Sequence, residues 1–269
     1  MNMISLRNIQ KSYGSHQVLR GVNLTVRQGE IYGLIGKNGS GKTTIFKIIL
    51  GLTEFENGLL SIAGKSTKAE LSNSRKKIGF FIGKNFFDYL TAAENLEYYR
   101  RMKGVRDKGE TQRVLKLVGL DNSAAKFASF SMGMKQRLGI ANAMLGNPEI
   151  LILDEPVNGL DPQGIADIRN LLAALSRDYG TTIIVSSHIL GELEHTATRF
   201  GIIDQGRVLR EITHEDLKVP NDKIQLRVSD CAAAKRILAE NGISVLRESP
   251  ECKSLEDYYF ELVEGTIHE

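Results

Sequence analysis

A glycine-rich run carries the clearest chemical meaning in this sequence. It follows the pattern of a glycine, four residues and then Gly-Lys-Ser/Thr, and it comprises Gly36, Lys37, Asn38, Gly39, Ser40, Gly41, Lys42 and Thr43, with Thr44 next. Glycines let successive backbone N–H groups turn inward, so such a loop forms a cradle for phosphate groups. The Lys42 ammonium then meets the β- and γ-phosphates, and the Thr43 hydroxyl is a ligand for Mg²⁺. The run predicts a site for a nucleoside triphosphate with Mg²⁺, and the alternative is a glycine-rich turn without a ligand.

Two adjacent carboxylates follow an apolar strand later in the chain. Asp154 and Glu155 come directly after Ile150–Leu153, a run of four large aliphatic residues. Charges at the end of a buried strand are costly unless they meet a cation or water. In a phosphate-loop protein we expect Asp154 to hold Mg²⁺, directly or through water, and Glu155 to polarise the attacking water. The alternative is an exit from strand to loop with solvated acids.

The spacing of apolar residues predicts an α/β fold, a phosphate-loop NTPase with a parallel sheet at its core. Short apolar strands that alternate with helices are typical of such a sheet. A helix begins near Lys42 and includes Leu52, and an antiparallel β-subdomain precedes it. Strands are expected at 4–9, 18–26, 31–35, 78–82, 150–153, 181–186 and 200–204.

The chain divides into a large and a small part. We predict a nucleotide-binding domain at 1–212, with a helical subdomain at about 88–147, and a small α+β appendage at 213–269. Thr91, with Glu94 three residues later, is expected to cap the first helix of the helical subdomain. In the appendage, strands are expected near Ile224 and at 243–246, and helices at 232–240 and around Tyr258.

Composition limits the classes of function. The chain has 269 residues, of which 42% are hydrophobic and 25% charged, and its net charge is +3. A net charge this small does not predict nucleic acid or an anionic membrane surface as a partner. Two cysteines do not form a disulfide framework, so a reducing cytosol is the expected compartment. The first residues lack a signal-peptide pattern. No apolar run approaches the roughly 20 residues that a membrane-spanning helix needs. If the protein acts at a membrane, we therefore expect another chain to supply the channel.

A third segment separates one family of phosphate-loop proteins from the rest. Residues 130–137 read Phe-Ser-Met-Gly-Met-Lys-Gln-Arg, and this segment resembles the Leu-Ser-Gly-Gly-Gln-x-Gln-Arg signature of the ABC ATPase family. Residues 158–162 resemble that family's D-loop, and His188 resembles its switch histidine. Tyr13 stands where the family stacks an aromatic ring on adenine. These segments occur in the family's order between residue 4 and about residue 212.

The resemblance implies an ATPase that binds ATP and Mg²⁺, with Glu155, His188 and Lys42 as its catalytic residues. In the family, the signature of one subunit contacts the γ-phosphate of ATP held by a second subunit, so Ser131 and the N–H of Gly133 are the implied contacts. The implied partners are a second ATPase subunit, identical or different, in a nucleotide-dependent dimer, and transmembrane permease subunits, with no nucleic acid. The implied location is the cytoplasmic face of a bacterial membrane.

Simpler interpretations of three of these residues stay open. Ser131 is a good N-cap for an amphipathic helix, and capping alone would explain it. A histidine after a strand is often structural, and Tyr13 could pack within a turn.

The sequence departs from the family pattern at two places. Met132 and Met134 stand where the signature has a glycine and a glutamine, and no glutamine follows the strand at 78–82, where Gly83 or Lys84 would take its place. The sequences of the signature and of Leu90–Leu96 resemble those of ABC ATPases of the bacitracin-resistance type, which act in export of, or immunity to, peptide antibiotics.

Aromatic residues cluster between 80 and 89. Phe80 and Phe81 are expected in the strand core, and Phe86, Phe87 and Tyr89 in an exposed patch that contacts the permease.

Two other classes of function compete with a transporter ATPase. One is a soluble ABC ATPase that acts on the ribosome or on DNA, which usually carries two such domains or a long coiled coil. This chain has one domain of this kind and no heptad run. The other is a regulatory ATP-binding module without turnover, which the presence of Glu155 and His188 disfavours.

Overall fold

The structure is a computed structural model that describes residues 1–83, 86–217, 228–243 and 245. Contacts within the chain divide it into two units, Met1–Lys218 and Val219–Glu269. In the second unit the described residues contain one helix, α9 (Cys231–Glu240), which begins after Asp230 caps its first N–H groups. The strand expected near Ile224 and the last expected helix lie outside the described residues, as do parts of the strand expected at 243–246.

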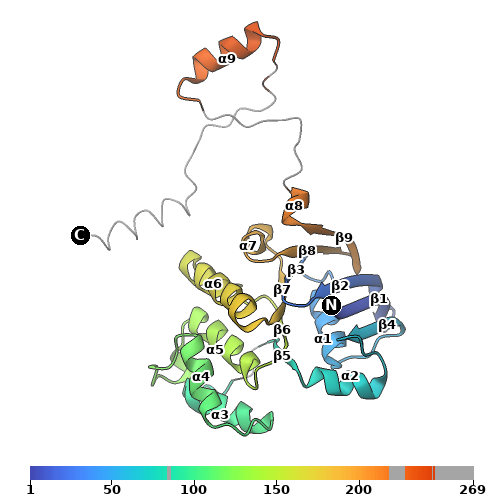
Figure 1. Ribbon diagram of the computed structural model, residues 1–269, viewed down its shortest axis with the longest axis vertical. Helices are drawn as coiled ribbons and strands as arrows, with labels where there is room; N and C mark the ends of the chain where they lie inside the picture. The colour runs from blue at the N-terminus through green and yellow to red at the C-terminus, as the bar shows by residue number, and fades with distance from the viewer. Residues whose placement is uncertain (84–85, 218–227, 244, 246–269) are drawn as a thin grey trace, which may run out of the picture. The chain divides into compact units, whose positions relative to one another are not determined.

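The first unit contains two sheets (Figure 1). The smaller sheet is antiparallel and has the order β2-β1-β4, formed by β1 (Asn2–Tyr13), β2 (His16–Arg27) and β4 (Asn57–Ile62). The larger sheet has the order β5-β6-β7-β3-β8-β9, in which only β9 runs antiparallel to its neighbour. Its strands are β3 (Ile31–Ile35), β5 (Ile78–Phe81), β6 (Ile150–Leu153), β7 (Thr182–Ser187), β8 (Arg199–Asp204) and β9 (Arg207–Thr213).

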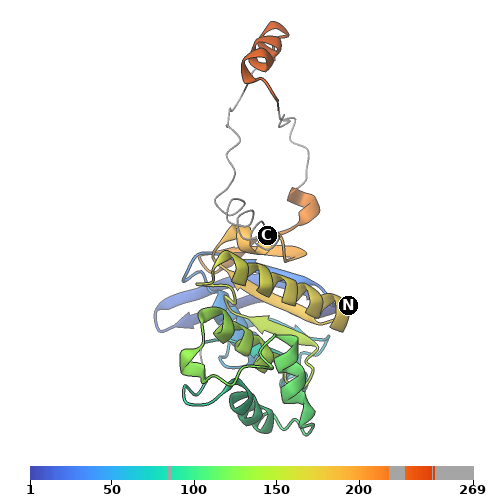
Figure 2. The same cartoon turned by 90° about the vertical axis from the view of Figure 1, so that its left-hand side faces the viewer.

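Helices connect the strands of the first unit. They are α1 (Lys42–Leu50), α2 (Lys68–Arg75), α3 (Ala92–Met102), α4 (Gly109–Leu117), the 3₁₀ turn η1 (Phe127–Ser129), α5 (Met132–Met144), α6 (Pro162–Tyr179), α7 (Leu190–Glu194) and α8 (His214–Leu217). Figure 2 looks onto the side where α6 lies along the sheet and α3, α4 and α5 gather beside it. Within the described residues, none of the helices combines the length and apolarity that a bilayer crossing requires.

Alternate residues of the central strands serve two separate hydrophobic cores. In β6, Ile150 and Ile152 pack with α1 and the antiparallel sheet, whereas Leu151 and Leu153 pack with α5 and α6. Successive side chains of a strand point to opposite faces, so a strand buried on both faces reads as a continuous apolar run. Each large aliphatic side chain that is fully buried contributes about 1.5–3 kcal/mol relative to exposure. The larger sheet is therefore held between two apolar layers, and its strand ends are fixed in place.

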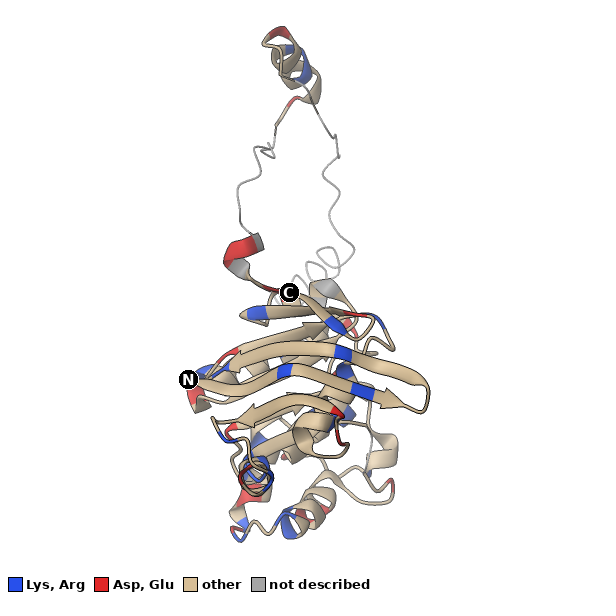
Figure 3. Ribbon diagram, turned by 90° about the vertical axis from the view of Figure 1, so that its right-hand side faces the viewer, with Lys and Arg blue, Asp and Glu red and all other residues tan. Residues whose placement is uncertain are grey.

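The outer face of the antiparallel sheet carries three arginines together with the exposed Leu59 of β4. Arg7, Arg20 and Arg27 are exposed on β1 and β2, and Figure 3 shows Lys and Arg standing singly along these strands. Antiparallel sheets commonly have one face on a core and the other in solvent. The apolar face of this sheet is the one that packs against α1.

The predicted fold class is confirmed, with two local corrections. The helix that starts at Lys42 ends at Leu50 rather than including Leu52, because Gly51 adopts a left-handed conformation with φ 74° and ends it. Phe80 is 38% exposed and is not a core residue, since β5 is an edge strand of its sheet. Phe81, on the opposite face, packs against the α5 core as expected.

The capping box predicted at the start of α3 is confirmed and gives a test of the helical region. The Thr91 hydroxyl accepts the N–H of Glu94, and the Glu94 carboxylate accepts the N–H of Thr91. Losing an N-cap costs about 0.5–2 kcal/mol, so Thr91→Ala should lower the unfolding midpoint by about 2–4 °C per kcal/mol lost. Thermal denaturation followed by circular dichroism measures the shift. Ser72→Ala, in the exposed middle of α2, should leave the midpoint unchanged or raise it slightly; equal losses in both variants would contradict the capping argument.

Candidate phosphate and acid site

The phosphate loop lies between the end of β3 and the start of α1 and is tightly packed from beneath. A Cβ on Gly36 would lie 2.3 Å from the carbonyl oxygen of Ile203, so a larger residue cannot occupy that position. Gly41 has φ 112°, and a Cβ there would lie 2.6 Å from Leu19 Cδ2. The solvent-exposed part of the loop consists of Lys37, Asn38 and Gly39. Close packing at Gly36 and Gly41 therefore leaves no room for a side chain at either position.

Two features of the loop fit an anion. The hydroxyl of Ser40 is buried and has no hydrogen-bond partner within the described structure, although buried hydroxyls are normally paired. The helix α1 begins at Lys42 without a side-chain cap, so the positive end of its dipole faces the loop. Thr43 and Thr44 lie half-buried in its first turn. A phosphate group in the loop would meet both the unpaired hydroxyl and the uncapped N–H groups.

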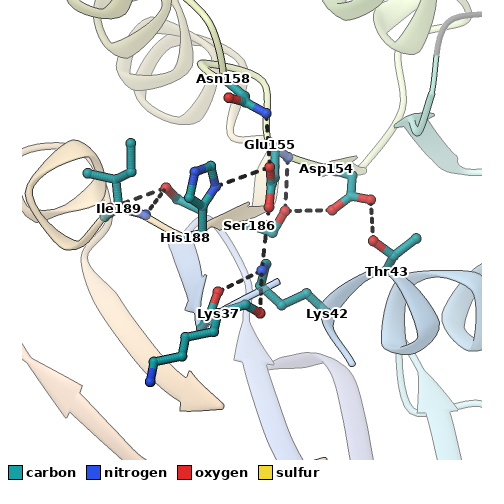
Figure 4. A network of polar contacts seen from close by, with 11 residues as sticks. Lys37, Lys42, Thr43, Asp154, Glu155, Asn158, Ser186, His188 and Ile189 are labelled. Atoms are coloured by element: carbon teal, nitrogen blue, oxygen red, sulfur yellow. Dashed lines mark hydrogen bonds and ion pairs between the residues drawn. The ribbon is translucent and has the colours of Figure 1, made fainter. Parts of the chain in front are cut away.

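The ammonium of Lys42 is buried inside the loop (Figure 4). It donates to the carbonyl oxygens of Gly36 at 2.7 Å and Lys37 at 3.2 Å, and it lies 3.4 Å from Glu155 Oε1. A buried ammonium needs such partners because desolvation of an unpaired charge is costly. The positive charge is thus held at the centre of the cradle.

The acid pair follows β6 and faces the loop. The Thr43 hydroxyl donates to Asp154 Oδ2 at 2.6 Å. The two residues are 111 positions apart in the sequence, and their side chains meet at the carboxyl end of the parallel sheet.

These oxygens fit Mg²⁺. Magnesium prefers hydroxyl and carboxylate oxygens and usually completes its coordination with substrate phosphates and water rather than with an all-protein cage. Thr43 and Asp154 are the residues that would hold the ion next to phosphates in the loop.

Glu155 occupies a strained and highly connected position. Its φ is 51°, a left-handed conformation that is uncommon for a residue other than glycine and costs about 1–3 kcal/mol. His188 Nδ1 lies 3.2 Å from Glu155 Oε2, and Asn158 Nδ2 donates to the same oxygen at 3.2 Å. The carboxylate is therefore aimed between Lys42, Asn158 and His188, as Figure 4 shows. Strain of this kind persists where surrounding contacts fix it, which often marks a functional site.

Tyr13 lies at the end of β1, where its ring is 49% exposed and the Lys11 ammonium is 5.1 Å from the ring centroid. The hairpin that follows leads into Val18 and Leu19, the residues in contact with Gly41. Tyr13 therefore belongs to a hairpin whose second strand packs against the phosphate loop.

The signature segment lies apart from the phosphate loop. Ser131 caps α5 as expected, because its hydroxyl accepts the N–H of Met134 at 3.2 Å. Residues 131–134 and 159–161 line a hollow of about 510 Å³ that also includes Arg137 and Asp167. Among the described residues, no hydrogen bond joins Ser131 or Gly133 to the phosphate loop.

Sequence reasoning missed two residues that the structure brings to the acid pair. Asn158 is predicted only as part of the segment that resembles the D-loop, without a role of its own, and Ser186 is predicted only as the end of a strand. Ser186 contacts both Asp154 and Glu155. The signal that could have identified it is the alternation of β7, which directs Ser186 to the same face as Ile184 and therefore toward α1.

The aromatic cluster after β5 is only partly exposed. Phe86 is half-buried and packs against Tyr99 and Phe127, with ring centroids 5.6 and 5.2 Å away, so its expected exposure is wrong. Phe87 is half-buried as well, so its expected exposure is also wrong. Its ring contacts Tyr89 and Tyr98, and these two tyrosines are exposed.

The loop that carries Phe87 is held rigidly. The buried Asn95 side chain accepts the N–H of Phe87 at 2.8 Å and donates to its carbonyl oxygen at 3.1 Å. We define the aromatic patch as Phe87, Tyr89 and Tyr98. Gly83 is exposed, and Lys84, the other candidate for the missing glutamine, lies outside the described residues.

Comparison with known proteins identifies a family model, sequence relatives and solved structures that are similar to this chain. A family model described as ABC transporter matches residues 19–158, which include the phosphate loop, the signature segment and the acid pair. The bacitracin transport ATP-binding protein BcrA of Enterococcus faecalis is 36% identical over 298 residues, covering 98% of this chain and 97% of that protein. The lantibiotic transport ATP-binding protein SrtF of Streptococcus pyogenes is 40% identical over 212 residues, covering 78% and 90%. Among solved structures, a dimeric ATP-binding cassette in a post-hydrolysis state, bound to ADP and Pi, has a TM-score of 0.70 at 30% identity and covers 78% of this chain and 98% of its own.

The buried ammonium gives the first test of the site. A hydrogen bond to a charged group contributes about 1.5–3 kcal/mol, so Lys42→Ala should weaken ATP binding by about 10–150-fold. Isothermal titration calorimetry with ATP measures the change. Lys47→Ala removes the same charge from an exposed position of the same helix and should bind ATP normally. Equal affinities of the Lys42→Ala variant and the unaltered chain would remove Lys42 from the phosphate site.

Proposed function

Because the chain belongs to the ABC transporter family of ATP-binding proteins, we propose that it powers the export of a peptide antibiotic or drug through membrane subunits supplied by other chains. Hydrolysis of ATP coupled to transport is the activity of this family. The single observation that carries the proposed mechanism is the placement of Glu155 between Lys42 and His188, at 3.4 and 3.2 Å.

In the proposed mechanism ATP lies in the phosphate loop with its base on Tyr13. Lys42 then meets the β- and γ-phosphates, in competition with its present ion pair to Glu155. Mg²⁺, held by Thr43 and Asp154, would neutralise part of the phosphate charge. Glu155 accepts a proton from the water that attacks the γ-phosphorus, the bond from that phosphorus to the bridging oxygen breaks, and ADP and phosphate leave. Asn158 donates a hydrogen bond that orients the Glu155 carboxylate, and His188 Nδ1 lies 3.2 Å from the same carboxylate oxygen.

The separate position of the signature segment supports a dimer in which each chain completes the site of the other. Ser131 and Gly133 line an open hollow rather than the phosphate loop of their own chain. A γ-phosphate presented there by a second ATPase subunit would meet the Ser131 hydroxyl and the start of α5, where the helix dipole favours an anion. The resemblance to a dimeric cassette bound to ADP and Pi adds to this argument.

The aromatic patch is the surface that we assign to the permease. Exposed aromatic side chains are rare on free surfaces and frequent at the centres of interfaces. Phe87 is held by Asn95, so the patch is preorganised and loses little conformational freedom on binding. Such an interface would tie the ATPase to the cytoplasmic face of the membrane and transmit closure of the dimer.

The antibiotic substrate class rests on similarity over nearly the whole chain. BcrA is named for bacitracin transport and SrtF for lantibiotic transport, and both substrates are peptides. Expression of the chain with its permease in a sensitive bacterium tests this class, since resistance should rise for a peptide antibiotic. ATP turnover stimulated by ribosomes or DNA, without a permease, would favour the soluble alternative.

Glu155→Gln tests the catalytic assignment. The amide keeps the size of the side chain but cannot accept the proton of water, and loss of a general base costs about 10²–10⁴-fold in rate. Phosphate release should fall by that factor, while ATP binding persists and a dimer accumulates in size-exclusion chromatography with light scattering. Glu149→Gln, at the other end of β6 and paired with Lys77, should turn over ATP normally. Normal turnover in the Glu155→Gln variant would remove Glu155 from this role.

The double change Phe87→Ala and Tyr89→Ala tests the permease surface. Loss of central aromatic anchors at an interface costs about 2 kcal/mol or more, so co-purification with the permease and resistance should be lost. ATP binding by the isolated chain should not change. Tyr179→Ala removes an exposed aromatic ring at the end of α6 and should assemble normally. Intact assembly of the double variant would place the permease contact elsewhere.

A further inference from the structure

We propose that Ser186 is a positioning residue for ATP hydrolysis, whose single hydroxyl fixes both Asp154 and Glu155. The inference rests on the function proposed above and adds a residue that none of the family segments contains. Ser186 is completely buried on β7. Its hydroxyl donates to Asp154 Oδ1 at 2.7 Å and accepts the N–H of Glu155 at 2.9 Å. One oxygen atom therefore holds the side chain of one acid and the backbone of the next (Figure 4).

The contact to Asp154 completes the orientation of that carboxylate. Asp154 Oδ2 accepts the Thr43 hydroxyl at 2.6 Å, and Ser186 holds the other oxygen. With a donor on each oxygen, rotation of the carboxylate is blocked. Side chains that orient a ligand in this way commonly change metal affinity or activity by about 10–100-fold when they are removed.

The contact to Glu155 stabilises a strained backbone. Glu155 has φ 51°, a conformation that persists only where surrounding contacts determine it. Its N–H is the donor to Ser186, so the hydrogen bond is made by the strained residue itself. Without the hydroxyl, this N–H would lose the partner that the structure gives it, and the direction in which the Glu155 side chain leaves the strand would be less well fixed.

The sheet explains why position 186 has this role. The parallel pairing of β6 with β7 places Leu153 opposite Val185, so the next residues, Asp154 and Ser186, lie side by side. Ile184, two residues earlier, faces the α1 core, and the period of two along a strand directs Ser186 to the same side. Thr43 is on α1, so the three side chains meet because of register and not because of nearness in sequence.

A purely structural serine would give a different result from a positioning one, and Thr182 provides the comparison. Thr182 is on the same strand and fully buried, and its hydroxyl accepts the N–H of Gly29 at 3.0 Å, away from the acids. Thr182→Val and Ser186→Ala each remove one buried hydroxyl and should lower thermal stability. Only Ser186→Ala should change catalysis and the response to Mg²⁺.

The experiment uses the full chain and two readouts. The kcat of ATP hydrolysis should fall about 10–100-fold in Ser186→Ala, with a higher Mg²⁺ concentration at half-maximal rate. Calorimetric binding of a non-hydrolysable ATP analogue should be unchanged in EDTA but should lose most of its strengthening by Mg²⁺. Ser186→Thr restores the hydroxyl and should recover both properties, and Thr182→Val should match the unaltered chain.

Several results would overturn the inference. They are an unchanged kcat and Mg²⁺ dependence in Ser186→Ala, or equal losses in Ser186→Ala and Thr182→Val. Should Ser186→Ala not fold, Ser186→Cys keeps the volume with a weaker donor, and normal kcat and Mg²⁺ dependence there would count equally against it. If the unaltered chain with its permease does not hydrolyse ATP, the proposed function fails, whereas the binding measurement with Mg²⁺ or EDTA still decides the role of Ser186.

Discussion

The parallel register of β6, β7 and β3 is the constraint on which the site depends. The last residue of β6, Leu153, pairs with Val185, and the last residue of β3, Ile35, pairs with Ser187 at the end of β7, so the three strands end within two residues of one another. The acid pair follows β6, Ser186 lies near the end of β7 with His188 directly after that strand, and the phosphate loop follows β3. The carboxyl edge of an open parallel sheet is where ligands bind in folds of this kind. A shift of one residue in any of the three strands would reverse the direction of every side chain on it and take the acids away from Thr43.

That constraint is what allows several charges to lie close together in a partly buried space. Lys42 is buried and its charge is shared among two carbonyl oxygens and Glu155. A cation and a carboxylate taken out of water are stable only if their remaining hydrogen bonds are satisfied. The two apolar layers that enclose the sheet keep the strand ends from relaxing, because close-packed cores resist small displacements. The protein can therefore hold Glu155 in an unfavourable backbone conformation at the point where the proposed reaction takes place.

The parts of the site that local sequence specifies were predictable, whereas the parts that depend on strand neighbours were not. A few consecutive residues are enough to specify each of three features: the phosphate loop, the Thr91 capping box and the cap at Ser131. The structure contains all three at the expected positions. Ser186 could not be predicted, because its role depends on which strand lies beside β6 and in which register. The exposure of Phe80 likewise follows from the edge position of β5. Phe86 turned inward because Tyr99 and Phe127, distant in sequence, provide an apolar site for its ring.

Met132, which departs from the family pattern of the signature, borders an open hollow. Met132 replaces a glycine at a surface where a second subunit is expected to approach closely. Its side chain lies beside Gly159, whose missing Cβ would stand 3.9 Å from Met132 Cγ, and the hollow between the two segments stays open at about 510 Å³. Methionine is flexible and adapts its shape to the contact it meets. Met132 remains 38% exposed, so it presents apolar surface next to the Ser131 cap. In the proposed dimer, the second ATPase subunit would bury this surface while the ATP that it holds meets the start of α5.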